Sequence, residues 1–476
     1  MPYVSPGVYI REFDFSQFVE AVGTTIFGVV GTAQKGPMNT PWLITNEAQF
    51  VDLFGAPFVN SMAGYAAIEY LRRGTRCVFV RVGSSSKAKA TFTIPDIAPA
   101  GTLKVDAVSE GTWANGVRVA ISAGTVTGTF KLIVQDLNGF QVEAYDNLVQ
   151  TPSTSVNYSE TRINGISRYI TVDQLLTTLP AVGAYTLAGG NNGTTGIADA
   201  DYIGTITGNT RTGLQCLRNP ESVQLNLIAV PGVSSGAVVT AMISIVEARN
   251  DSLALVDPPL GLTVQGVIDY HNGVGYTHAA FVSNKAALYW PWVQIYDQYN
   301  SVNVFVPPSC MAAQAIAYND SVAEPWFAPA GVQRGHILDG LSLEYSPTQG
   351  ERDQMYSGGN AINPIVNFPR DGICIFGQRT LQRSASSLNR INVRRMLFFI
   401  EQAIASSARF LMFDQTDAVL WKRFRDLVEP FLETVRSRRG LEQYQVICDA
   451  ATNPDYVKND NEMRGKVYLV RPRLEF

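Results

Sequence analysis

The chain has 476 residues, of which 46% are hydrophobic and 16% are charged. This length exceeds one typical hydrophobic core and predicts two to four domains, and the composition excludes an intrinsically disordered protein. The net charge of −4 at neutral pH argues against a general nucleic-acid-binding protein.

The charge is unevenly distributed along the chain. Residues 370–476 contain 18 Lys and Arg against 13 Asp and Glu, so this end carries +5 and the rest carries −9. A basic end on an acidic body suggests a polarised molecule that meets an acidic partner surface. The alternative is a scatter of solvated arginines without a partner.

Cysteine spacing and hydropathy argue against several further classes of protein. The five cysteines lie far apart without a C-x-x-C pair, which favours buried reduced thiols over disulfides or a zinc site. The start of the chain has neither the basic nor the apolar region of a signal peptide. Residues 222–246 are uncharged, but Pro231-Gly232 in their middle favours a strand, loop and helix over a membrane span. We expect no cofactor, no metal and no membrane insertion.

Residues 1–20 are predicted to be an extended N-terminal arm. Prolines and a glycine discourage a helix here, and Val4, Val8 and Ile10 lie on one side of an extended chain. From residue 21 to 89, strands at 24–30, 42–44 and 76–82 alternate with helices that Asn46 and Ser61 can cap. This alternation predicts an α/β module.

Residues 90–199 are predicted to be an inserted all-β domain. Short alternating strands are separated by glycine-rich turns, and the one helical pattern falls at 172–179. Alternation of helix and strand then resumes over residues 200–370, with a strand at 225–230 and a helix at 237–249. We expect residues 21–89 and 200–370 to form one α/β core.

Residues 371–463 are predicted to be a C-terminal α+β domain. It opens with a buried strand at 373–376 and continues with two amphipathic helical patterns. Pro430 lies in the second helix and predicts a kink or break near Glu429. A strand at 444–448 follows, and residues 464–476 form a last strand and terminal arm. The predicted fold class is therefore multidomain, α/β and α+β, with an all-β insertion.

One pattern points to an enzyme. Residues 232–236 read Gly-Val-Ser-Ser-Gly, which matches the G-x-S-x-G nucleophile turn between a strand and a helix. Asp257 ends the next strand, and a histidine downstream could complete a serine hydrolase centred on Ser234. Against this, no glycine-rich oxyanion loop lies upstream, and a helix-capping role for Ser234 or Ser235 explains the same residues. No phosphate-binding loop with the required spacing is present.

Motifs in order along the chain resemble the contractile bacteriophage tail sheath family. They are Ser5-Pro6-Gly7-Val8-Tyr9, Asp257-Pro258-Pro259, the run from Ala286 to Trp292, Val306-Pro307-Pro308-Ser309, the run from Gly372 to Leu381, Asn392-Val393-Arg394-Arg395 and Arg471-Pro472. The chain departs from the usual family residues at Gly331, Phe376 and Gln378. The matches cover residues 1–85 and 200–476, and the predicted insertion lies in the family's variable region.

The resemblance implies a structural protein of the virion. Many copies would stack as hexameric rings around a tail tube and contract to drive the tube through the host envelope, after assembly in the host cytoplasm. The implied partners are further copies of the chain, the tail tube protein, and baseplate and tail-terminator proteins, with no direct nucleic-acid contact. A role of the insertion in binding another surface is compatible with this function.

The resemblance also implies that neighbouring copies exchange strands. The donor strands would contain Val4, Val8, Tyr9, Ile10, Val467, Tyr468, Leu469, Val470 and Arg471. The acceptor strand would contain Tyr444, Val446 and Ile447. The basic side chains expected to face the tube are Lys422, Arg423, Arg425, Arg436, Arg438 and Arg439.

Overall fold

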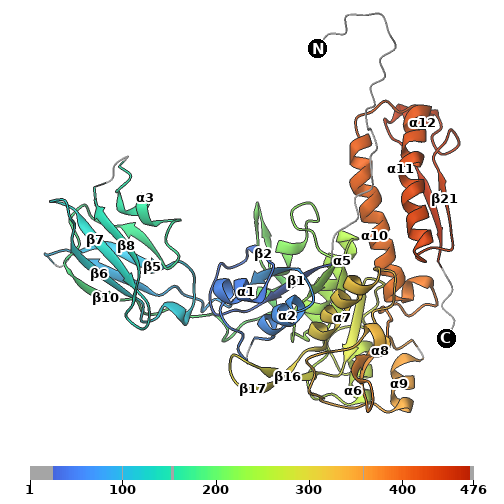
Figure 1. The fold of residues 1–476 in the computed structure, drawn as a ribbon, viewed down its shortest axis with the longest axis horizontal. Coiled ribbons are helices and arrows are strands. Elements are labelled where there is room, and N and C mark those ends of the chain that lie inside the picture. The colour runs from blue at the N-terminus through green and yellow to red at the C-terminus, as the bar shows by residue number, and fades with distance from the viewer. Residues whose placement is uncertain (1–24, 60, 99, 152–154, 358, 472–476) are drawn as a thin grey trace, which may run out of the picture. The chain divides into compact units, whose positions relative to one another are not determined.

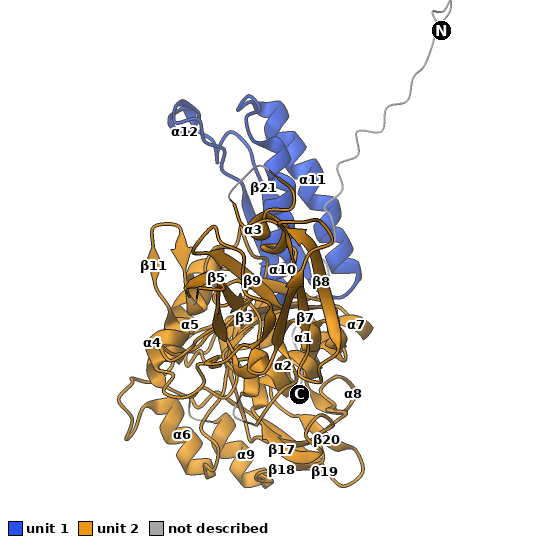
Figure 2. Ribbon diagram, turned by 90° about the vertical axis from the view of Figure 1, so that its left-hand side faces the viewer, with its two compact units in different colours: residues 1–23, 395–476 blue, residues 24–394 orange. Residues whose placement is uncertain are grey.

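The computed structural model describes residues 25–471 except 60, 99, 152–154 and 358. The chain divides into two compact units after Arg394, and each unit is described by itself (Figure 2). The multidomain α/β and α+β fold predicted from the sequence is confirmed, because the chain contains several separate β-sheets together with α-helices. Within the described residues, every helix is too short or too polar to cross a lipid bilayer.

An eight-stranded sheet forms the centre of the first unit (Figure 1). In sheet order its strands are β2 (Pro41–Ile44), β3 (Arg76–Arg81), β1 (Ile26–Gly31), β13 (Leu227–Ala229), β14 (Leu253–Val256), β15 (Ala286–Trp290), β19 (Ile362–Phe368) and β20 (Gly372–Ile375). The six inner strands run parallel, and the two edge strands run antiparallel to their neighbours. Because β1 pairs directly with β13, strands from both sides of the insertion share one sheet.

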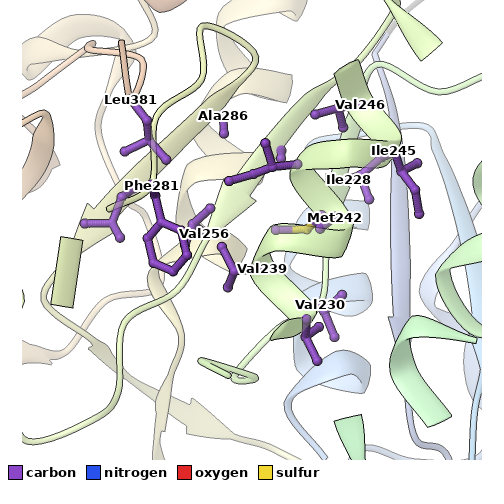
Figure 3. Close-up of a cluster of buried hydrophobic side chains, with 14 of the residues drawn as sticks. Ile228, Val230, Val239, Met242, Ile245, Val246, Val256, Phe281, Ala286 and Leu381 are labelled. Atoms are coloured by element: carbon purple, nitrogen blue, oxygen red, sulfur yellow. The ribbon is translucent and has the colours of Figure 1, made fainter. Parts of the chain in front are cut away.

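Side chains that alternate along the strands cover both faces of this sheet. On one face, Ile228 and Val256 lie in a single buried cluster with Met242 of α5 (Gly236–Arg249) (Figure 3). On the other face, Phe27 meets Tyr70 of α2 (Met62–Leu71) with ring centroids 5.1 Å apart. The strands are buried on both faces, which explains why they read as continuous apolar runs.

The helices of this unit follow the caps and apolar patterns in the sequence. Asn46 accepts from the backbone N–H of Gln49 and starts the first helix, as its residue type predicts. The helices are α1 (Glu47–Phe54), α2 (Met62–Leu71), α4 (Asp199–Ile203), α5 (Gly236–Arg249), α6 (Val264–Asn272), α7 (Pro308–Val322), α8 (Gly331–Arg334) and α9 (Gln349–Tyr356). Smaller sheets contain β11 (Ile206–Thr207) with β12 (Thr210–Arg211), and β17 (Val302–Val306) with β16 (Val293–Asp297) and β18 (Ser342–Leu343).

The insertion is a β-sandwich with a hydrophobic core of its own (Figure 1). One sheet has the order β10 (Gly183–Thr186), β6 (Arg118–Ala123), β7 (Phe130–Gln135) and β8 (Gln141–Leu148). The other has the order β4 (Thr91–Pro95), β5 (Gly101–Ala107) and β9 (Ile170–Gln174), and α3 (Ser159–Ile163) precedes β9. The predicted helix at 172–179 is wrong, because Val172 pairs with Val105 in the second sheet.

A buried arginine ties the base of the insertion to the central sheet. Arg81, at the end of β3, is fully buried and donates Nε to the Ala33 carbonyl at 3.1 Å. Its Nη1 donates to the carbonyl oxygens of Gly36 at 2.7 Å and Glu110 at 2.9 Å. Burial lowers the pKa of Arg81 to about 10. These bonds join the loop after β1 to the base of the sandwich, and a lost partner here would leave a buried charge uncompensated.

The second unit contains two long helices, one short helix and a two-stranded sheet. These are most of α10 (Ile391–Ala408), α11 (Ala418–Ser437), α12 (Asp455–Asn459), β21 (Gln443–Ile447) and β22 (Lys466–Val470). The sequence placed the start of the C-terminal domain at residue 371. In the structure β20 belongs instead to the eight-stranded sheet, because Cys374 pairs with Val366 of β19.

Two carboxylates share two donors where α2 meets α7. Arg72 Nη1 lies 3.1 Å from Glu69 Oε1 and 3.2 Å from Asp339 Oδ2. Gln314 Nε2 lies 3.4 Å from an oxygen of each carboxylate. Glu69 is buried, and this burial, which Arg72 only partly offsets, raises the pKa of Glu69 to about 7.

We predict that Glu69→Gln flattens the pH dependence of stability. Because the folded pKa of Glu69 is raised, the stability from this group is complete below its unfolded pKa and is lost as pH rises through about 7. The variant should therefore gain up to about 3 kcal/mol in unfolding free energy over wild type between about pH 5 and about pH 8. Thermal unfolding measured at both pH values tests this.

The matched control for this experiment is the exposed Glu221→Gln. It should retain the wild-type pH dependence. A Glu69→Gln chain with the wild-type dependence would contradict the raised pKa of this buried carboxyl group.

Candidate assembly interface

The long helix α11 organises the C-terminal unit. Asp417 accepts from the backbone N–H groups of Val419 and Leu420 and so caps its start. Its buried side chains lie on one face and are Leu420, Trp421, Phe424, Leu427, Val428, Leu432 and Val435. The predicted break near Glu429 does not occur, since the helix continues through Pro430 to Ser437. Pro430 is exposed, and burial of the apolar face on both sides of it offsets the one missing backbone hydrogen bond.

The strands β21 and β22 form an antiparallel hairpin. Tyr444 is opposite Leu469 and Val446 is opposite Val467. These four side chains are half-buried and alternate with exposed ones such as Tyr468. Contacts with α11 come from Tyr444, whose Oη donates to Glu433 at 3.1 Å. One face of the hairpin is thus covered and the other is exposed.

In the single chain, the predicted donor and acceptor strands are therefore paired with each other. Residues Val467, Tyr468, Leu469 and Val470 lie on β22, with Arg471 directly after it, and Tyr444, Val446 and Ile447 lie on β21. The other predicted donor residues, Val4, Val8, Tyr9 and Ile10, lie outside the described residues. Pairing between copies stays a prediction for both segments.

Both outer edges of this hairpin are open within the described part of the chain. Each of the two strands has one partner, so alternate backbone N–H and C=O groups on its other side point outward. An open strand edge is a template on which a strand of another chain can form. The arrangement offers two such edges within the described residues 395–471 of this unit.

A buried asparagine closes the connection between the two strands. The Asn453 side chain accepts from the Arg464 backbone N–H at 2.6 Å and donates to the Arg464 carbonyl at 3.1 Å. It also donates to the Asp449 carbonyl at 3.0 Å. The amide thus pairs with Arg464 as a neighbouring strand would, and it fixes the start of β22.

The six basic residues predicted to face a tube lie on α11 or just after it. Among the described residues, Lys422 pairs with Asp426, Arg423 with Asp414, and Arg436 with Glu433. All three pairs are exposed, so each contributes little to stability. Arg425 is half-buried, and Arg438 and Arg439 are exposed beyond the helix end. A tube contact by this surface stays a prediction.

The G-x-S-x-G turn does not form a hydrolase site. The carboxylate of Asp257 is fully buried and accepts from the Gly232 N–H at 3.1 Å, from the Ser309 N–H at 2.7 Å and from Ser309 Oγ at 2.6 Å. Within the described residues these are its hydrogen bonds, and none involves a histidine. The Asp257 carboxylate instead lies at the N-terminus of α7, where two backbone N–H groups and a hydroxyl satisfy it.

The Ser235 hydroxyl and the Ser234 backbone carbonyl each have a structural partner. Ser235 Oγ donates to Asp199, and the Ser234 carbonyl accepts from Tyr270 Oη at 2.9 Å. His278 stacks on Phe281 with ring centroids 4.2 Å apart. The serine hydrolase hypothesis is therefore not supported.

Family profiles match most of the chain after the insertion. The profile described as phage tail sheath protein central domain matches residues 197–381, and the one described as phage tail sheath C-terminal domain matches residues 383–470. The chain belongs to the phage tail sheath family. The C-terminal profile contains α11 and both strands of the hairpin.

Curated tail sheath proteins are similar to more than half of the chain. The tail sheath protein of Vibrio phage KVP40 is 29% identical over 309 residues, which cover 60% of this chain and 44% of that protein. The tail sheath protein of Enterobacteria phage T4 is 31% identical over 266 residues, covering 52% of this chain and 40% of that protein. The matches thus span less than half the length of these two relatives. Both relatives are named as sheath proteins and neither as an enzyme.

The fold as a whole is similar to that of a solved sheath assembly. A chain of the PVC sheath complex of an extracellular contractile injection system, in the contracted state, superposes with a TM-score of 0.57 at 17% identity. The superposition covers 100% of this chain and 98% of that chain. At this identity the likeness shows the fold.

We predict that Asn453→Ala loosens the hairpin. The substitution leaves the backbone N–H and C=O of Arg464 without their partner and should cost roughly 2–4 kcal/mol of unfolding free energy of the C-terminal unit. Amide hydrogen exchange should rise over residues 464–470. The exposed Asn459→Ala in α12 is the matched control, and equal exchange in the two variants would contradict the role of Asn453.

Proposed function

We propose that the chain is a structural subunit of a contractile tail sheath. Copies would assemble as stacked hexameric rings around a tail tube in the virion, and contraction would drive the tube through the host envelope. Family membership supports the sheath role, and the likeness to a sheath complex solved in its contracted state supports contraction. Further copies of the chain, the tube protein, the baseplate and the tail terminator are the proposed partners.

The observation that carries this proposal is the pair of open edges on the β21–β22 hairpin. We propose that the N-terminal arm, through Val4, Val8, Tyr9 and Ile10, adds a strand to the hairpin of a neighbouring copy. Each added backbone hydrogen bond contributes about 0.5–1.5 kcal/mol. A polymer multiplies this contribution because every copy both gives and receives a strand.

The strand β22 is the second proposed donor. Exchange would place its residues 467–470 against β21 of a neighbour in the register that the single chain already shows. Such a swap conserves every side-chain contact of the hairpin and changes only which chain supplies the strand. Its cost is thus confined to opening the hairpin and ordering the connection.

Deleting residues 1–12 should abolish polymerisation. Without the arm one of the two proposed donor strands is missing and an edge of the neighbour's hairpin stays unfilled, whereas the described fold begins at residue 25 and should be retained. Electron microscopy of concentrated protein measures the outcome: tubes or rings for the full chain, and single particles with wild-type circular dichroism for the deletion. A deletion chain that forms normal tubes would exclude arm exchange.

The control for this deletion replaces residues 1–12 with a Gly/Ser sequence of equal length. The replacement restores chain length but not the apolar alternation of the arm. It should fail to polymerise in the same way.

A pair of cysteines at Gln445 and Tyr468 distinguishes exchange from an intact hairpin. These exposed residues are opposite each other in the register, at a separation that a disulfide can span. If β22 is exchanged, oxidation of assembled tubes should give ladders of linked chains on a non-reducing gel. Disulfides confined to single chains would show that β22 pairs with β21 of its own chain, which would leave the arm as the only proposed donor.

A further inference from the structure

The connection between β21 and β22 is fastened to its own unit up to the residue where β22 begins. Val457 of α12 is fully buried, and Lys458 Nζ lies 5.3 Å from the centre of the Trp421 ring on α11. A Cβ atom on Gly465 would lie 2.7 Å from a ring atom of Phe424, so the backbone at Gly465 is held close against α11. The fastened part thus extends to the residue that precedes β22.

The Asn453 side chain holds the end of this connection. It is fully buried, and it bonds to both backbone groups of Arg464. The turn that carries it is closed as well, because the Asp449 carboxylate accepts from the backbone N–H groups of Ala451 and Thr452, each at 3.0 Å. We call Asn453 together with these two groups of Arg464 the clasp. Opening the clasp takes the Arg464 N–H away from the buried Asn453 side-chain oxygen, and a buried acceptor without a donor is costly.

The strand β22 itself is held loosely. None of its five residues is buried. Val467 and Leu469 are half-buried, and the other three are exposed. Within the described part of the chain its backbone pairs with β21 alone, and a two-stranded sheet is marginal by itself in water. The hold on β22 is therefore concentrated at its root, in the clasp, and is weak along its length.

The clasp also limits how far β22 can reach. While the clasp is closed, the donor strand starts at Gly465 and can meet only a β21 that lies within a few residues' length of this point, at about 3.3 Å per residue. When the clasp opens and Val457 leaves its buried place, the residues between Asn453 and Gly465 join the free segment. Each of them then lengthens the reach by about 3.3 Å. Exchange over a longer distance therefore requires the clasp to open.

We propose that the Asn453 clasp is an autoinhibitory latch. It keeps β22 paired with β21 of the same chain before assembly, and exchange of β22 begins when the clasp opens. The latch rests on the proposed function, in which copies exchange β22. The outer edges of the hairpin carry no such restraint among the described residues, so they can accept an arm while the clasp is closed. The latch thus sets an order, in which the arm of a neighbour binds first and β22 is exchanged second.

Assembly kinetics of the full-length chain test the latch. Asn453→Ala removes the clasp, and light scattering should show that the time to half-maximal assembly shortens about tenfold, because the loss of such hydrogen bonds changes a rate by about this factor. Asn453→Asp keeps the acceptor for the Arg464 N–H but loses the donor, so it should give a smaller acceleration. The exposed Asn459→Ala is the matched control and should assemble at the wild-type rate.

A covalent lock shows whether the clasp acts through β22. Gln445→Cys with Tyr468→Cys, oxidised in the unassembled chain, ties β22 to β21 of its own copy. Asn453→Ala should then leave the assembly rate of the locked chain unchanged, and reduction of the disulfide should restore the acceleration. Acceleration that persists in the oxidised chain would show that Asn453 does not act through release of β22, and would overturn the latch.

Failure of the latch and failure of strand exchange give different results. Ladders of linked chains from oxidised tubes, together with wild-type kinetics for Asn453→Ala and Asn453→Asp, would overturn the latch and leave the exchange of β22 in place. Tubes without such ladders would remove the exchange of β22 and the latch with it. A full-length chain that forms neither tubes nor rings at any concentration would contradict the sheath function on which the latch rests.

Discussion

Unpaired backbone groups along the outer edges of β21 and β22 are the constraint on which the assembly argument depends. A two-stranded sheet is marginal in water without further strands or a helix against it. The chain supplies part of the missing support through α11, which covers one face, and through Asn453, which holds the connection. Within the described residues the outer edges have no partner strand. In the proposed assembly, the open edges that leave the hairpin marginal alone would be the sites where strands of neighbouring copies bind.

The rest of the chain forms compact bodies that exchanged strands could link to neighbouring copies. The eight-stranded sheet is buried on both faces, and its core is continuous from Val30 to Leu381. Arg81 fixes the insertion to this body through carbonyl groups of two separate loops. Rigid bodies joined by exchanged strands can change their mutual angles without breaking the linking hydrogen bonds. This is the mechanical requirement for a polymer that shortens.

The central fold was predictable because its signals are local. Asn46 marks a helix start, and apolar runs mark strands buried on both faces. The failures have non-local causes. The segment around Val172 reads as a helix but pairs with β5, and β20 joins the large sheet because β19 lies beside it. A kink or break was expected at Pro430, but the helix continues past it without a break because its apolar face is buried on both sides.

The candidate interface was only partly predictable. The sequence identified both strands of the hairpin, but their register cannot be read from alternation alone. Their exchange between copies, which the family resemblance implies, stays a prediction. The sequence did not indicate the role of Asn453, because its side chain bonds to Arg464, which approaches it only in the folded chain.

The carboxyl ends of parallel strands, where α/β proteins commonly hold ligands, are filled here by the protein itself. Asp257 after β14 bonds to Gly232 after β13 and to the start of α7, and Trp292 after β15 donates to the Pro258 carbonyl at 2.9 Å. The crevice that nucleotide-binding proteins of this architecture keep open for their ligand is closed here by these hydrogen bonds within the protein. In the proposed sheath, the energy of contraction would be stored in contacts that form while the particle is built.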